Sequence, residues 1–262
     1  MNTRKSLKTE ILSGIHPVAE ALAAGRRRIY RIYVNQDNPA KRVSKIAELA
    51  RKKDIPVSPV LREEIRKMTD NINHQDIAAG TDKFPVSNLG SLYGQAGQSG
   101  RETFLLILDS IVDPHNLGAL VRTAVCTGVS GIIIPRDRCA APTPAVSRAS
   151  AGALEHARIA VATNLANIMK DLKKNHFWII GLDQKGGLPV YETDMTGARA
   201  LVIGGEDTGI RPLVKRQCDF LCRIPQTVPL GSLNASVAGG IAMYEALRQR
   251  MKKEATKKKG SG

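Results

Sequence analysis

The sequence predicts an α/β protein with a small N-terminal α/β module and a larger C-terminal domain. We expect that domain to contain a mostly parallel sheet with helices on both faces. One observation is the alternation of apolar, strand-like runs with segments of helical spacing, which is typical of parallel sheets. A second is the run "FLLILD" at Phe104–Asp109, which is apolar up to its last residue, as in strands covered on both faces.

In the N-terminal module, two segments have helical spacing, His16–Ala24 and Ala40–Lys53. The runs Ile29–Val34 and Ile55–Val60 alternate with them and predict strands. Residues 1–84 therefore form the first expected domain. The stretch 87–102 is rich in Gly, Ser and Gln and lacks apolar periodicity, so residues 85–102 predict a flexible linker.

After the linker the alternation continues through residues 103–251, the second expected domain. The expected strands are Phe104–Asp109, Gly131–Pro135, a short one around Ile159, Phe177–Asp183, Ala200–Gly205 and Phe220–Pro225. The expected helices are Leu117–Thr127, Thr143–Leu154, one that opens at the N-cap residues Thr163 and Asn164, and Ala235–Lys253. The basic, low-complexity tail 252–262 predicts disorder.

The net charge of +15 is unevenly distributed. Residues 1–84 hold 17 Lys and Arg against 10 Asp and Glu, and residues 248–262 hold 7 against 1, whereas the middle is almost neutral. Such segregation favours contact with a nucleic-acid backbone over the alternative that basic surfaces only maintain solubility. The N-terminus has no apolar signal-peptide core and no apolar run is long enough to span a membrane, so we expect a cytoplasmic protein without a membrane partner.

Several classes of site are not indicated. The four cysteines form no C-x-x-C pair and the five histidines no metal-spaced cluster, which argues against a zinc site or a disulfide framework. Neither a strand-to-helix G-x-G-x-x-G nor a P-loop is present, and there is no G-x-S-x-G elbow. The residues alone indicate an α/β enzyme whose ligand is held by loops at strand ends.

Three such loops carry unusual chemistry: Asp113–Asn116 followed by Arg122, "GGEDTGI" at Gly204–Ile210, and "IPQTVPLGSLNASVA" at Ile224–Ala238. Each has a purely structural alternative. Asn116 and the Ser-x-Asn of the third loop are good helix caps, an arginine can cover apolar neighbours, and paired glycines suit turns. Three of these loops at strand ends of one domain make coincidence a weak explanation.

The segments "DPHNLGALVRTA", "LVIGGEDTGI" and "IPQTVPLGSLNASVAGGIAMYEALRQR" resemble the three motifs of the SpoU/TrmH family of RNA 2′-O-ribose methyltransferases. The segments "GIHPVAEALAAG" and "HQDIAAG" resemble the L30e-like substrate-binding domain of the RlmB branch, which methylates a guanosine of 23S ribosomal RNA. That branch usually has His-Gln-Gly where this chain has His74-Gln75-Asp76, and often a methionine at the position of Gln226. The target nucleotide therefore stays open.

The resemblance implies a SPOUT fold with a trefoil knot, S-adenosylmethionine bound in the knot without a metal, and a homodimer formed through the C-terminal domain. By their positions in the motifs, the residues expected to be catalytic are Asn116, Arg122, Glu206, Ser232 and Asn234. Backbone groups at Gly204, Ile224 and Leu233 are expected to hold the cofactor. Arg122 is expected to clamp the target phosphate, because a guanidinium is a poor base, and Glu206 to orient a neighbouring side chain.

Arg26, Arg27 and Arg28 form a basic run in the N-terminal module and are candidates for RNA contact; a solvated helix end is the structural alternative. Two other functions remain open. One is a methyltransferase of the same fold that acts on transfer RNA or on a resistance-conferring ribosomal position. The other is a non-catalytic RNA-binding protein of ribosome assembly.

Overall fold

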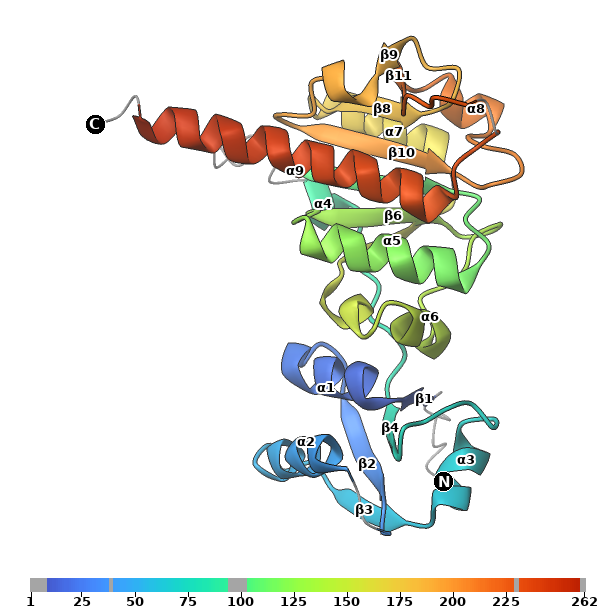
Figure 1. Cartoon of the computed structure of the whole chain (residues 1–262), viewed down its shortest axis with the longest axis vertical. Helices are drawn as coiled ribbons and strands as arrows, with labels where there is room; N and C mark the ends of the chain where they lie inside the picture. Colours follow the sequence, from blue (N-terminus) through green and yellow to red (C-terminus); the bar gives the residue numbers. More distant parts are fainter. Residues whose placement is uncertain (1–8, 38–39, 94–102, 229–230, 260–262) are drawn as a thin grey trace, which may run out of the picture. The chain divides into compact units, whose positions relative to one another are not determined.

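Two sheets organise the chain. The computed structural model describes residues 9–37, 40–93, 103–228 and 231–259. It divides into one unit made of Met1–Pro85 with Pro142–His156, and a second made of Val86–Ala141 with Ala157–Gly262. Each unit contains one of the sheets (Figure 1).

The sheet of the second unit is parallel throughout its described strand pairs. Its seven strands, in spatial order, are β7 (Ile159–Ala162), β6 (Gly131–Pro135), β5 (Phe104–Asp109), β10 (Arg199–Gly204), β8 (Trp178–Leu182), β11 (Phe220–Arg223) and β9 (Leu188–Pro189). The expected α/β fold with a parallel sheet is therefore confirmed. Because β5 and β10 are neighbours, the loops that leave their carboxyl ends meet at one edge of the sheet.

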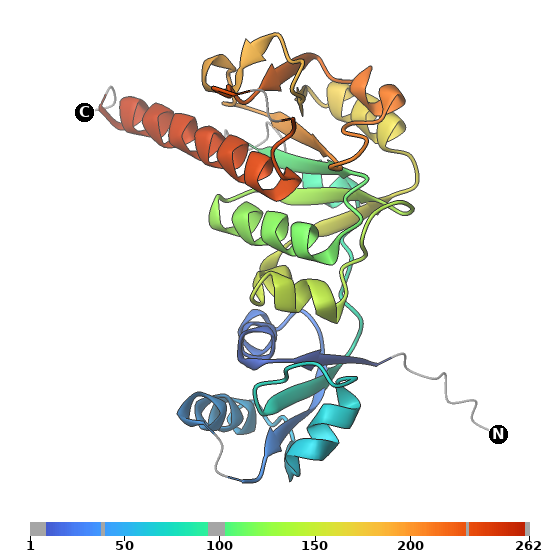
Figure 2. The ribbon, with the colours of Figure 1, turned by 45° about the vertical axis from the view of Figure 1, so that its right-hand side comes forward.

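Helices cover both faces of this sheet, which explains why β5 and β6 are buried along their whole length. Apolar side chains from three helices pack on one face; these helices are α4 (Gly90–Tyr93), α7 (Leu165–Lys174) and α8 (Pro212–Lys215). Two helices, α5 (Pro114–Cys126) and α9 (Ala235–Lys259), lie side by side on the other face (Figures 1 and 2). Gly239 lets α9 pack closely against α5, because a Cβ at this position would lie 2.4 Å from Cδ2 of Leu120 in α5.

The first unit contains a mixed sheet in the order β1 (Glu10–Ser13), β4 (Ile77–Thr81), β2 (Ile29–Asn35) and β3 (Val57–Val60). Residues 1–85 also contribute the helices α1 (Ile15–Ala24), α2 (Lys41–Arg51) and α3 (Arg62–Met68) to this unit. The strand β4 was not expected from the sequence, although every residue of this strand is buried. Its sequence, IAAGT, has a single β-branched apolar residue, so strand propensity gives little signal there.

The segment 142–156 lies within the range assigned to the C-terminal domain from sequence, yet it packs in the first unit. It contains α6 (Pro144–Ala149) and the 3₁₀ helix η1 (Ala153–His156). Nε of Arg27 lies 2.9 Å from Oε2 of Glu155, and Oγ of Ser147 donates to Oε1 of the same carboxylate at 2.8 Å. Both charged side chains are buried. A buried ion pair therefore joins two stretches that are 128 residues apart in the chain.

The linker and the tail differ from expectation where they are described. Residues 90–93 form α4, and Leu92 is buried in the core of the second unit. Of the expected linker, residues 94–102 lie outside the described residues. The tail was expected to be disordered, but α9 continues to Lys259, and only 260–262 lie outside the described residues. Lys, Glu and Ala are good helix formers, and a helix already nucleated extends readily through them.

Candidate active site

Three of the predicted catalytic side chains form one hydrogen-bond network at the edge where β5 and β10 end. Asn116 lies in the first turn of α5, Glu206 follows β10, and Asn234 directly precedes α9. Nδ2 of Asn234 donates to Oδ1 of Asn116 at 2.9 Å and also to Oε1 of Glu206. The same Glu206 oxygen accepts a hydrogen bond from the backbone N–H of Ala235, 3.4 Å away.

The orientation of Asn234 is fixed because its amide oxygen caps α9. Oδ1 accepts hydrogen bonds from the backbone N–H groups of Ser236 at 2.9 Å and Val237 at 3.2 Å. The amide nitrogen must then point toward Asn116 and Glu206. Asn234 therefore does cap a helix, as the structural alternative for the Ser-x-Asn segment proposed. The same side chain also organises the hydrogen-bond network.

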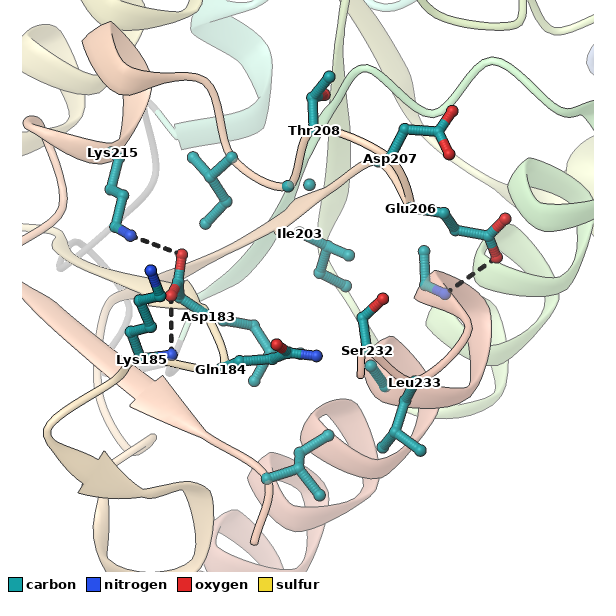
Figure 3. Close-up of a pocket in the computed structure, with 18 of the residues that line it drawn as sticks. Asp183, Gln184, Lys185, Ile203, Glu206, Asp207, Thr208, Lys215, Ser232 and Leu233 are labelled. Atoms are coloured by element: carbon teal, nitrogen blue, oxygen red, sulfur yellow. Dashed lines mark hydrogen bonds and ion pairs between the residues drawn. The ribbon is translucent and has the colours of Figure 1, made fainter. Parts of the chain in front are cut away.

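A cavity of about 490 Å³ lies on one side of the 205–208 loop (Figure 3). The three residues expected to hold the cofactor, Gly204, Ile224 and Leu233, all line it, as do Ser232 and Glu206. Its walls combine apolar side chains with backbone from three loops. This combination is typical of sites for small organic ligands, and so is the volume.

Two glycines of the second loop are required by close backbone contacts. A Cβ at Gly204 would lie 2.1 Å from the carbonyl carbon of Gly209, and one at Gly205 would lie 2.4 Å from the carbonyl oxygen of Ser110. Glycine is thus required by close contacts within the protein itself. Gly209 also has a φ of +61°, in the left-handed region that favours glycine.

Charged side chains that also line this cavity were not predicted from the sequence. Oδ2 of Asp183 lies 2.7 Å from Nζ of Lys215, and the backbone N–H of Lys185 donates to Oδ1 at 2.9 Å (Figure 3). Burial acts to raise the pKa of Asp183, but these hydrogen bonds outweigh it and lower the pKa. The carboxylate is therefore ionised at neutral pH. The signal in the sequence is an acid at the end of the apolar strand "WIIGL".

The same residues, 205–208, also line a second cavity, of about 430 Å³. Asn116 and Glu206 line it together with Arg138 and Arg211. Below it, the buried carboxylate of Asp109 accepts hydrogen bonds from Nε of Arg211 at 2.7 Å and from its backbone N–H at 2.9 Å. This pair ties the 205–211 loop to the end of β5. The signal in the sequence is again an acid, Asp109, at the end of an apolar strand.

The remaining predicted residues lie apart from this network. Arg122 is exposed on α5 and lines neither cavity; it lies six residues, about 9 Å of helix rise, beyond Asn116. In the first unit, Arg27 is buried between Glu10 and Glu155. Arg26 lies over the ring of Phe84 and Arg28 over that of Tyr30. The geometry therefore gives Arg27 a structural role and leaves Arg26 and Arg28 as candidates for RNA contact.

Comparison with known proteins identifies the family to which this site belongs. The profile of the SpoU rRNA Methylase family matches residues 103–244, more than half of the chain. The chain belongs to this family. A second profile, RNA 2′-O ribose methyltransferase substrate binding, matches residues 11–86. The resemblance seen in the motifs is confirmed, and with it the assignment as an S-adenosylmethionine-dependent RNA 2′-O-ribose methyltransferase.

Two relatives illustrate the similarity. The chain is 38% identical to the 23S rRNA (guanosine-2′-O-)-methyltransferase RlmB of Acinetobacter baylyi over 93% of this chain and 99% of that protein. It is 36% identical to YacO of Bacillus subtilis, named as a TrmH family tRNA/rRNA methyltransferase, over 94% of this chain and 98% of that protein.

Two solved structures have the same fold. AviRb, a SpoU methyltransferase of Streptomyces viridochromogenes in complex with AdoMet, superposes with a TM-score of 0.79 at 22% identity, covering 96% of this chain and 94% of that one. An AdoMet-bound rRNA methyltransferase from Sinorhizobium meliloti has a TM-score of 0.73 at 25% identity, covering 94% and 89%.

The first cavity fits S-adenosylmethionine by its chemistry as well as its size. Leu182, Ile203 and Leu233 provide apolar walls for an adenosine, and the carboxylates of Asp183 and Glu206 suit a ligand that carries positive charge. In the described ranges, no group of three or more His, Cys, Asp and Glu side chains could hold a metal ion. None of the described helices is long and apolar enough to cross a lipid bilayer.

Proposed function

We propose that this methyltransferase acts on the ribose 2′-hydroxyl of a guanosine in 23S ribosomal RNA. The observation that carries the proposal is the Asn116–Asn234–Glu206 network, in which Glu206 lines both a cofactor-sized cavity and a second cavity. The name of the A. baylyi relative, which matches along almost its whole length, supports the ribosomal guanosine as the substrate. The substrate-binding profile over residues 11–86 supports RNA capture by the first unit.

Methyl transfer to a hydroxyl is an in-line displacement, in which bound S-adenosylmethionine supplies an electrophilic methyl group. The protein must hold the 2′-oxygen close behind the methyl carbon, and such positioning can contribute about 7–11 kcal/mol. Asn116 is suited to this task. Because its Oδ1 accepts from Asn234, its Nδ2 is turned outward as a donor toward an oxygen of the substrate.

Glu206 holds the network in place instead of acting as the base. Its Oε1 accepts from both Asn234 and the Ala235 N–H, so this oxygen is engaged in orienting the two groups at the start of α9. Ser232 lines the cofactor cavity on the opposite wall from Asp183, where its hydroxyl can contact the reacting groups. Arg122 stays a candidate to bind a phosphate of an RNA strand that runs along α5.

The enzyme is proposed to work as a homodimer through its C-terminal domain. Val237, Tyr244 and Met251 are exposed on α9 and follow one another at intervals of seven residues. This spacing places three large apolar side chains along one stripe of the helix, the pattern of a helix that packs against a partner. Tyr244→Glu is expected to convert a dimer to a monomer in analytical ultracentrifugation, whereas Glu254→Lys, farther along the helix, is not.

A transfer assay tests the proposed function. Purified protein, 23S rRNA transcribed in vitro and radiolabelled S-adenosylmethionine are expected to give one 2′-O-methylguanosine, with no loss of activity in EDTA. Transfer RNA and 16S rRNA serve as control substrates. Label in transfer RNA would show the alternative substrate, and binding of 23S rRNA without any transfer would show a non-catalytic RNA-binding protein.

A further inference from the structure

The second cavity contains two arginines, and only one of them is already engaged. Arg211 is held by the buried carboxylate of Asp109. The guanidinium of Arg138 has no ion pair or hydrogen bond to any residue in the part of the chain that the structure describes. It lines the same cavity as Asn116 and Glu206. Arg138 is therefore a cation available to an anionic ligand beside the catalytic network.

The backbone of Arg138 is held in an unfavourable conformation. Its φ is +62°, in the left-handed region that costs a residue with a Cβ, and arginine has no short polar side chain to relieve that cost. The loop that carries it is fixed against the first catalytic loop, because the N–H of Ala140 donates to the carbonyl oxygen of Ile111 at 2.8 Å. Strain of this kind concentrates at functional sites, where a particular side chain must be presented.

No acid that lines this cavity forms an ion pair with Arg138 in the described part of the chain. Asp113 accepts the N–H of His115 at 3.0 Å as the cap of α5, and Glu206 accepts from Asn234 and Ala235. Asp207 is exposed at the cavity rim. The positive end of the α5 dipole also lies at this cavity, where Asn116 occupies the first helical turn. The available charges thus favour a ligand that offers an anionic group near Arg138 and a neutral polar group near Asn116.

We propose that Arg138 binds a backbone phosphate of the RNA beside the target ribose and thereby positions the 2′-hydroxyl at Asn116. This inference rests on the proposed function, since the ligand is taken to be the RNA substrate. A guanidinium can hold a phosphate through two parallel hydrogen bonds, which fixes orientation as well as distance. A nucleotide held at its phosphate by Arg138 can present its ribose to Asn116 and Glu206, which line the same cavity.

Three variants test this role. Arg138→Gly removes the guanidinium and also relieves the backbone conformation, so the melting temperature is expected to stay equal or to rise. Arg138→Lys keeps the charge but loses the two-bond geometry. Arg136→Ala is the matched control, because Arg136 is an exposed arginine of the same loop that does not line the cavity. Filter binding to a 23S rRNA transcript over a salt series and methyl-transfer kinetics are the two readouts.

Arg138→Gly is expected to raise KM for RNA about tenfold and to flatten the slope of log Kd against log salt by about 0.7–0.9. Binding of S-adenosylmethionine should not change. Arg138→Lys should recover the slope but not the full KM, and Arg136→Ala should match the wild type. A wild-type slope and KM in Arg138→Gly would overturn the proposal, as would a lower melting temperature, which would indicate a structural role. A flattened slope in a protein that transfers no methyl group would support Arg138 as an RNA contact and refute the proposed function instead.

Discussion

The amide nitrogen of Asn234 lies 2.9 Å from Oδ1 of Asn116, although 118 residues separate the two in the chain. The same Asn234 side chain caps α9 through its oxygen. One residue therefore fixes the start of the last helix and the direction in which Asn116 points. A single amide group thus caps the last helix and holds the proposed catalytic network together.

These two roles of Asn234 can be separated by Asn234→Ser. Serine is also a good N-cap, so the free energy of unfolding should change by less than about 1 kcal/mol. Loss of the donor to Asn116 and Glu206 should lower kcat on the order of 10²-fold, as when one donor of a preorganised site is removed. Asn164→Ser is the matched control, since Asn164 caps α7 and lines neither cavity. A wild-type kcat in Asn234→Ser would show that the network is not needed for catalysis.

The glycine contacts of the second loop predict a selective loss of cofactor binding. A methyl group at Gly204 would collide with the backbone of Gly209 and Ile210 and displace the loop. Gly204→Ala should therefore weaken S-adenosylmethionine binding by at least about tenfold, or about 1.4 kcal/mol, in calorimetry. Gly187→Ala should bind normally, because a Cβ there has no heavy atom within 4 Å. Equal affinities would show that the loop tolerates the change.

The three consecutive arginines of the first unit are expected to behave differently from one another. Arg27→Ala leaves the buried carboxylate of Glu155 without its partner and should cost about 3–5 kcal/mol in urea unfolding. Burial already raises the pKa of Glu155, against the opposing influence of Arg27 and Ser147. Arg26→Ala and Arg28→Ala should leave stability nearly unchanged and weaken RNA binding. A stable Arg27→Ala protein with reduced RNA affinity would reverse these assignments.

The surroundings of His74 predict that the stability of the first unit depends on pH. Burial lowers the pKa of His74, and although the charge of Asp76 acts to raise it, the guanidinium groups of Arg62 and Arg66 lower it further. Below the ordinary value of about 6.5, the unfolded chain therefore binds a proton that the folded chain resists. The associated stability is present above that pH and is lost as the pH falls through the lowered pKa.

His74→Asn tests this dependence, because an asparagine oxygen can replace Nδ1 as the acceptor of the Asp76 N–H, which lies 3.0 Å away. The wild type should lose more stability than the variant between about pH 7.5 and about pH 5.5, since only the wild type has an imidazole at position 74. Urea unfolding at both pH values measures the difference. Equal losses in the two proteins would exclude His74 as the source.

Much of the fold could be predicted from local patterns. The strands β5, β6 and β10 are continuous apolar runs, and their alternation with helices indicated a parallel sheet. The strand β4 was missed because its small residues carry little propensity. The union of residues 142–156 with the first unit was also missed, since the Arg27–Glu155 pair joins distant stretches and has no local signal. A knot is equally non-local, and only the motifs implied it.

The candidate site, too, could be predicted from the sequence only in part. Asn116, Glu206 and Asn234 stood out because polar residues follow apolar strands, and the motifs named them. Arg138 was not singled out, because nothing in the run "PRDRCA" distinguishes one arginine from the other. The difference arises from the left-handed backbone at position 138 and from the cavity that it faces. The position of Asp76 shows a related effect, since its φ of +61° suits the glycine found there in the RlmB branch.

Ribose methylation mapped across all ribosomal and transfer RNA, in cells with and without the gene, tests the central claim most directly. We expect one guanosine of 23S rRNA to lose its 2′-O-methyl mark in the deletion strain. The mark should return with the wild-type gene but not with the Asn234→Ser variant. An unchanged 23S rRNA, or a mark lost from transfer RNA instead, would contradict the assignment of this enzyme to a ribosomal guanosine.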